Sequence, residues 1–249
     1  MESVFAIALA ITAAVALARL ALWCDAPRTR PITVVLSLLA TGAIFIAPQW
    51  RDGVDSVFVT RGLAGLVSDV ALLVAVCLLC AHVARVWDND WLHRAALVIA
   101  VAGGLALVIV HAIAEHAGDR RGYTGQLSGP AMVYEIVLSV LLIAVNVAPL
   151  ITVALARPVT RGQFWFAASA LTWIGVAGLR GAATADPDGF ADTFWQLRLP
   201  LNTLVLVAGA GLGLSDLRRT RRRLFTATEQ RPGNCHGERI LGKWPSGSF

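Results

Sequence analysis

Long runs of apolar residues constrain this chain more than any other feature. Seven such runs follow one another along the 249 residues. A run of about 20 apolar residues is long enough for a helix to cross the hydrocarbon core of a bilayer. The runs are continuous and do not alternate, which favours helices over the strands of a barrel. We therefore predict an all-α, polytopic transmembrane helix bundle whose spans cover residues 4–23, 32–48, 62–83, 95–114, 131–156, 164–182 and 199–217.

The charge content agrees with a lipid environment. Only 15% of the residues are charged, whereas a soluble domain has about 25%. So few charges cannot cover a surface that faces water. This excludes a soluble globule, a disordered chain and a nucleic-acid-binding domain, despite the net charge of +5. The lipid bilayer is the expected partner.

Arginine placement predicts the orientation of the spans. Cytoplasmic loops carry the excess of Lys and Arg, and with the N-terminus outside the split is 14 inside against 6 outside. We predict an N-out, C-in protein that crosses the cell membrane seven times, with a bacterial inner membrane as the expected location. The second run is the shortest and ends at Pro48. A six-span bundle with this run re-entrant therefore stays open.

The segment 218–249 is predicted to be a basic, disordered cytoplasmic tail, because it is polar and rich in Gly and Pro. Its arginines follow the last span directly, where they can anchor the topology. They can also contact anionic lipid headgroups, which attract basic residues near the membrane surface. The candidates for this contact are Arg218, Arg219, Arg221, Arg222 and Arg223.

Ionisable and polar groups inside spans are costly and usually face the interior of a bundle. In the predicted orientation, five helices place such groups in the outer third of the membrane. We hypothesise that these residues line an outward-facing polar pocket for a small ligand or ion. They are Asp69, His111, Glu135, Arg180, Arg198 and Asn202.

A second interpretation applies to Glu135, Arg180 and Arg198, whose long side chains can extend to the headgroups. The side chain of Asp69 is too short for this, so we expect Asp69 to face Arg180 or Arg198 inside the bundle. Arg19 is expected to extend to the inner membrane surface. Asn146, three residues before Pro149, is expected to form a hydrogen bond to another helix at a kink.

The remaining motifs predict packing. Cys77 and Cys80 have C-x-x-C spacing but lie within a span, so we interpret them as core residues. Gly209 and Gly213, and also Gly103 with Gly104, allow helices to approach closely. His111, Glu115 and His116 leave an external metal site conceivable, but no ligand spacing of known type is present. No catalytic constellation is found, and we predict a protein without enzyme activity, metal or cofactor.

The layout resembles a family of proteins. The loop Ala26-Pro27-Arg28-Thr29-Arg30-Pro31, the leucine-rich second span and the seven spans in all are similar to uncharacterised actinobacterial membrane proteins that are labelled as transporters. The resemblance covers residues 1–225 and involves no specific motif. It implies a seven-helix membrane protein, but no substrate and no site residue.

Two functions follow as hypotheses. In the first, the protein binds a small ligand or ion at its outer face, as a sensor or a transport-like protein. In the alternative, it is a non-catalytic scaffold or partner subunit that packs against another membrane protein. A polar cluster open to the outside favours the first, whereas a filled bundle with small-residue grooves that face lipid favours the second.

Overall fold

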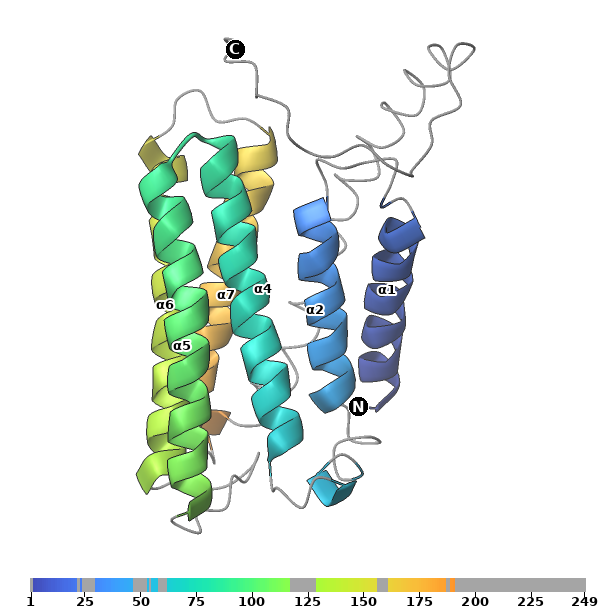
Figure 1. Cartoon of the computed structure of the whole chain (residues 1–249), viewed down its shortest axis with the longest axis vertical. Helices are drawn as coiled ribbons and strands as arrows, with labels where there is room; N and C mark the ends of the chain where they lie inside the picture. The colour runs from blue at the N-terminus through green and yellow to red at the C-terminus, as the bar shows by residue number, and fades with distance from the viewer. Residues whose placement is uncertain are drawn as a thin grey trace, which may run out of the picture.

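Long helices account for nearly all of the chain that the structure describes (Figure 1). The structure is a computed structural model, and it describes residues 2–21, 23, 30–46, 53, 55–57, 62–116, 129–155, 161–186 and 189–190. The helices are α1 (Glu2–Ala21), α2 (Arg30–Ile46), α4 (Leu63–Val86), α5 (Asp90–His116), α6 (Gly129–Leu155) and α7 (Arg161–Ala185).

These helices coincide with the first six predicted spans. Three segments are long and apolar enough to cross a membrane, namely Leu63–Arg85, Asp90–Ala114 and Gly129–Ala148. Leu9–Ala21 and Arg30–Phe45 are shorter apolar helices. The predicted seventh span (199–217), the tail (218–249) and all of their candidate residues lie outside the described residues.

The helices alternate in direction, so that the N-terminal ends of α1, α4 and α6 lie at the same end of the bundle (Figure 1). We call this the α4 N-terminal end and the other the α2 N-terminal end. Helix α4 lies in the middle of the bundle. Buried residues make up 67% of its spanning segment but only 22% of that of α5. At Gly42 of α2, an added Cβ would lie 3.1 Å from the backbone oxygen of Ser68, so α2 approaches α4 closely.

The outer face of α5 is aliphatic. Val98, Val101, Leu105 and Ile109 are exposed and recur at helical spacing. A contiguous apolar face of this length is rare on a soluble monomer, whereas hydrocarbon surrounds it without cost. The exposed face of α5 is therefore suited to contact with lipid.

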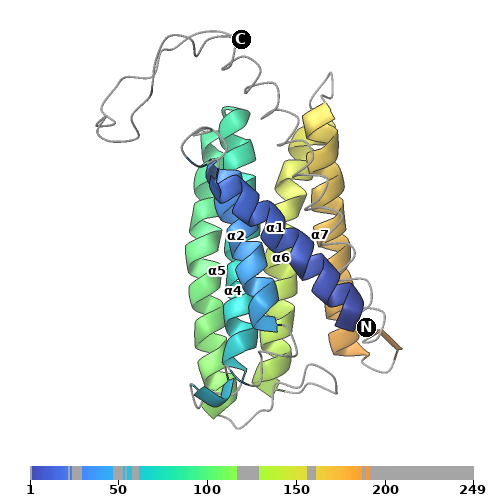
Figure 2. The same cartoon turned by 90° about the vertical axis from the view of Figure 1, so that its right-hand side faces the viewer.

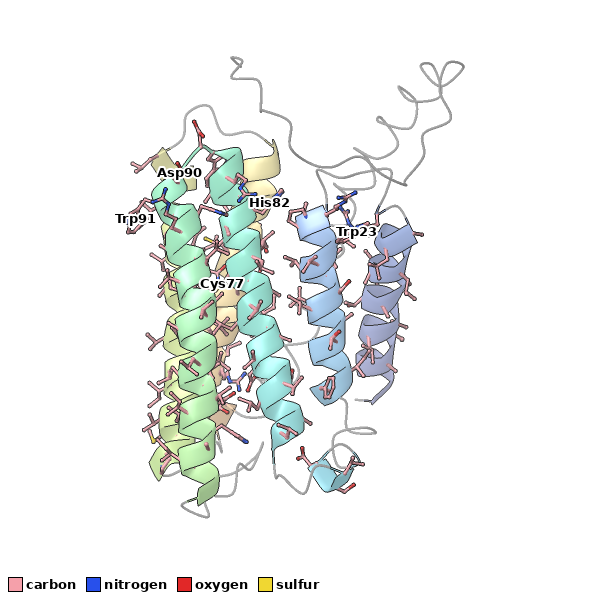
Figure 3. The ribbon with its side chains drawn as sticks, viewed as in Figure 1. Trp23, Cys77, His82, Asp90 and Trp91 are labelled. Carbon is pink, nitrogen blue, oxygen red and sulfur yellow. The ribbon has the colours of Figure 1, made fainter. Side chains whose placement is uncertain are left out.

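The apolar core lies between α4, α5, α6 and α7. Its fully buried members include Leu73, Leu107, Tyr134 and Trp173. Cys77 and Cys80 belong to the same cluster, and both are free thiols. Figure 3 shows Cys77 in the middle of α4. These thiols are packing residues of the core, as the sequence predicts.

Helices α4 and α5 are joined by a tight turn of three residues, Trp87–Asn89. Asp88 has a positive φ of 57°, a conformation that Asp tolerates better than most residues. The side chain of Asn89 caps α5 by accepting a hydrogen bond from the backbone N–H of Leu92 at 3.0 Å. The turn therefore holds the end of α4 close to the start of α5.

A second contact ties the same hairpin together. The ring of His93 on α5 lies 3.0 Å from the carbonyl oxygen of Ala81 through Nδ1 and 3.0 Å from the guanidinium of Arg85 through Nε2. A carbonyl only accepts and a guanidinium only donates. These contacts fit the arrangement in which Nδ1–H donates to Ala81 and Nε2 accepts from Arg85, and His93 thus links α5 to two positions of α4.

Gly103 lets α5 approach its neighbours. An added Cβ would lie 3.0 Å from methyl carbons of both Leu73 on α4 and Leu141 on α6. The next residue, Gly104, is also buried, but an added Cβ there meets only Val70, at 3.9 Å. The two glycines therefore differ in the space that surrounds them.

We predict different effects for the same substitution at these two positions. Each Gly→Ala change gains helix propensity of about 1 kcal/mol in a helix interior. Gly104→Ala should therefore raise the unfolding temperature of the detergent-solubilised protein. Gly103→Ala must displace two leucine side chains, and overpacking costs about 1–3 kcal/mol, so this variant should unfold at a lower temperature than Gly104→Ala. Equal unfolding temperatures would show that α5 does not pack through Gly103.

Candidate functional site

The start of α4 is fixed by a carboxylate that precedes it. Asp55 accepts hydrogen bonds from the backbone N–H groups of Gly62 (2.8 Å) and Ala64 (2.9 Å). Gly62 adopts a φ of 78°, which glycine tolerates without strain. With the first turn capped in this way, Asp69 falls in the second turn of α4, about 9 Å along the axis at 1.5 Å per residue.

Asp69 is buried, with 2% of its surface exposed, and forms a two-point ion pair. Nη1 of Arg180 donates to Oδ1 at 3.0 Å, and Nη2 donates to Oδ2 at 3.0 Å. Arg180 comes from α7, where it is also buried. A bidentate pair of this kind is among the strongest charge-assisted contacts. The pair that the sequence predicts between Asp69 and Arg180 is present.

Glu135 of α6 completes the ion-pair cluster. Nε of Arg180 donates to Oε2 of Glu135. Only 13% of the Glu135 side chain and 9% of the Arg180 side chain are exposed. Both side chains therefore turn toward each other, and the alternative in which they extend separately to the headgroups does not describe them.

Tyr134 joins the cluster next to Glu135. Its hydroxyl donates to Oδ2 of Asp69 at 3.2 Å, and its side chain is fully buried. Sequence reasoning missed this residue. The signal was available, because a Tyr beside a charged residue within a span needs a partner for its hydroxyl group.

His111 of α5 lies against the cluster through Tyr134. The two rings meet edge to face, with centroids 6.3 Å apart, and His111 is buried. The structure thus brings four of the six predicted site residues to one end of the bundle, from helices α4, α5, α6 and α7. Arg198 and Asn202 lie outside the described residues.

Among the described residues, the cluster holds two carboxylates and one guanidinium. Asp69 and Glu135 both contact the guanidinium of Arg180. A carboxylate or a guanidinium in a medium of low dielectric constant is costly unless it is paired. The three side chains therefore stabilise one another.

The hydrogen bond of Asn146 differs from the predicted one. Its amide nitrogen donates to the carbonyl oxygen of Leu142 at 2.7 Å, which lies one turn earlier in the same helix. The predicted hydrogen bond to another helix is therefore replaced by a local one within α6. A short polar side chain in a helix can reach its own backbone with less ordering than a neighbouring helix requires.

Metal ligation finds no support among the described residues. No group of three or more His, Cys, Asp or Glu side chains in those ranges is placed to hold a metal ion.

The shared guanidinium predicts a ranking of variants. Arg180→Gln removes the cation that both carboxylates contact, and breaking a buried pair costs about 3–5 kcal/mol. Asp69→Asn and Glu135→Gln each keep one contact between a carboxylate and Arg180, so they should lower the free energy of unfolding by less than Arg180→Gln does. Thermal unfolding in lipid nanodiscs measures this order, with exposed Arg94→Gln as the control. A carboxylate variant as unstable as Arg180→Gln would contradict this ranking.

The chain matches no protein-family model, no curated protein and no solved structure. The resemblance to actinobacterial seven-span proteins therefore stays a prediction based on layout.

Proposed function

We propose that this protein is a seven-span membrane protein that binds a proton or a monovalent cation at the cluster of Asp69, Glu135 and Arg180, as a sensor or a transport-like protein. The observation that supports this most directly is the contact of two carboxylates, from two helices, with one guanidinium. A carboxylate can take up a proton or coordinate a cation. The cluster thus places two such groups side by side.

The position of the cluster makes its charge state matter for the bundle. Arg180 is the only described residue of α7 that forms an ion pair, and it reaches both α4 and α6 through that pair. Protonating a carboxylate weakens its attraction to the guanidinium. Binding of a cation therefore changes how firmly α7 is held, which is the kind of coupling that a sensor or a transporter requires.

Several described arginines support the orientation in which the cluster lies toward the outside. Arg19, Arg30, Arg85, Arg94 and Arg161 all lie at the α2 N-terminal end, whereas Arg180 alone lies at the α4 N-terminal end. The positive-inside rule then assigns the α2 N-terminal end to the cytoplasm. Trp23 and Trp91, both exposed, lie at this end as interface residues would (Figure 3).

Cysteine labelling tests this orientation. In a variant without its native cysteines, Ser56→Cys lies at the α4 N-terminal end and Asp90→Cys at the α2 N-terminal end, both at exposed positions. A membrane-impermeant maleimide should label Ser56→Cys in intact cells and Asp90→Cys only after permeabilisation. The reverse pattern would reject the orientation, and labelling of both in intact cells would reject a span between them.

Proton or cation binding is tested on the purified protein in nanodiscs. Infrared difference spectra between about pH 6 and about pH 9, a range in which exposed carboxylates stay ionised, should show a protonated carboxylic acid in the wild-type protein. The band should be lost in Asp69→Asn or Glu135→Gln, because each variant removes one of the two carboxylates that can hold the proton. If sodium or potassium is bound instead, that ion should raise the unfolding temperature at constant ionic strength, relative to a bulky organic cation.

The control is exposed Asp186→Asn, which removes a carboxylate outside the cluster and should leave both signals unchanged. A wild-type protein with neither a protonated carboxyl band nor stabilisation by either ion would refute the proposal. The cluster would then serve only to hold the helices together, and the scaffold or partner-subunit function would be favoured.

A further inference from the structure

A second buried cation lies at the opposite end of the bundle, near the end of α1. Arg19 is 3% exposed, and its Nε, Nη1 and Nη2 atoms have no hydrogen-bond partner. Arg180, which is similarly buried, uses all three of these nitrogens. Its side chain is covered by protein atoms, so it differs from an arginine that extends freely to the membrane surface. A buried guanidinium without a counter-charge is costly.

The packing of α1 on α2 indicates what Arg19 faces. Ala16 forms a buried cluster with Leu36 and Ala40 of α2. Arg19 is three residues after Ala16, so it continues the same face of α1. The two helices run in opposite directions, and the last turn of α1 lies level with the first turn of α2 (Figures 1 and 2). Ile32 and Thr33 lie one turn before Leu36, in the first turn of α2. We therefore infer that Arg19 lies beside the first turn of α2.

The start of α2 is itself an electropositive place. The first N–H groups of a helix lack partners within the helix and carry the positive end of its dipole. In α2 these groups exclude Pro31, which has no N–H. The first turn of α2 contains no acidic residue. In α1 and α2 together the only acidic residue is Glu2, at the far end of α1. The described residues of these helices therefore offer Arg19 no carboxylate.

Arg30 adds a second guanidinium at the same end. Its Nε donates to the backbone oxygen of Trp23 at 3.1 Å, and its guanidinium carbon lies 5.5 Å from the centre of the Trp23 ring. This contact holds Arg30 at the first turn of α2. Trp23 is partly exposed, as a residue at the membrane interface would be. The region at the end of α1 and the start of α2 thus combines two guanidinium groups with a helix N-terminus. We expect this region to lie at the depth of the lipid headgroups.

We propose that Arg19, Arg30 and the first turn of α2 bind a phosphate oxyanion, and that an anionic phospholipid headgroup supplies it. Guanidinium groups and helix N-termini both match the geometry of phosphate oxygens. The neighbours of Arg19 on the outer side of α1, Leu17 and Leu20, are exposed and can contact the acyl chains of the same lipid. This site does not depend on the cation site, which lies at the other end of the bundle.

The test uses full-length protein in which the five tail arginines at positions 218, 219, 221, 222 and 223 are replaced by Gln, because they could also bind anionic lipid. Native mass spectrometry after titration with phosphatidylglycerol or phosphatidylcholine measures lipid binding. Phosphatidylglycerol should bind more tightly than phosphatidylcholine. Arg19→Gln should weaken phosphatidylglycerol binding about tenfold, as expected for the loss of one charge-assisted contact.

Two comparisons make this result specific. Arg94→Gln removes an exposed arginine at the same end of the bundle and should leave binding unchanged. Arg19→Lys keeps the charge and should recover part of the affinity. If Arg19→Gln does not fold, Arg30→Gln replaces it, because Arg30 lies at the edge of the site and is only partly buried.

A separate experiment distinguishes a lipid phosphate from phosphate in solution. Inorganic phosphate added to delipidated protein in detergent should raise the unfolding temperature only slightly if the lipid is the ligand. The other result is that inorganic phosphate stabilises the wild-type protein as much as phosphatidylglycerol does, and fails to stabilise Arg19→Gln. That result would assign the same oxyanion site to phosphate from solution. Equal phosphatidylglycerol binding by wild-type protein and by both Arg19→Gln and Arg30→Gln would overturn the proposal, as would a lack of preference for the anionic lipid.

Discussion

A charge buried inside this bundle is costly unless it meets another charge, because the apolar core offers no water to hydrate it. This constraint explains why Asp69, Glu135 and Arg180 converge from three different helices. It also explains why Tyr134 turns its hydroxyl into the cluster. Outside the cluster, α4 to α7 pack through aliphatic side chains, Cys77, Cys80 and Trp173. The apolar core sets how close the helices come, whereas the ion pairs select which faces meet.

The two ends of the described bundle differ in their charged groups. At one end, two carboxylates contact one guanidinium. At the other end, the described residues give Arg19 no hydrogen-bond partner, and Arg30 contacts a backbone oxygen and an aromatic ring. The two proposals, a cation at the first end and an anion at the second, start from these two sets of groups.

Much of the fold could be predicted from hydropathy. Six of the predicted spans coincide with helices, because a continuous apolar run has one stable conformation in lipid. The Asp69–Arg180 pair could be anticipated, because a short acidic side chain at membrane depth needs a partner. Gly103 was expected to be a packing residue, and it is one.

The details of pairing could not be predicted, because they depend on helix rotation. Hydropathy does not show that Glu135 and Tyr134, which are adjacent in α6, both reach the same cluster. It does not show that Arg19 faces α2, because a long side chain near a helix end has an equally reasonable path to the surface. Asn146 forms its hydrogen bond within its own helix, because a local acceptor lies within reach.

The short turn after α4 has a mechanical consequence. Asn89 caps α5 within the turn, and His93 joins α5 to Ala81 and Arg85 of α4. Polar contacts near the turn thus hold the α4–α5 hairpin together. The contacts of Arg180 and Tyr134 with Asp69 join this hairpin to α7 and α6 at its other end. Any displacement of α4 along α6 or α7 has to break these contacts first.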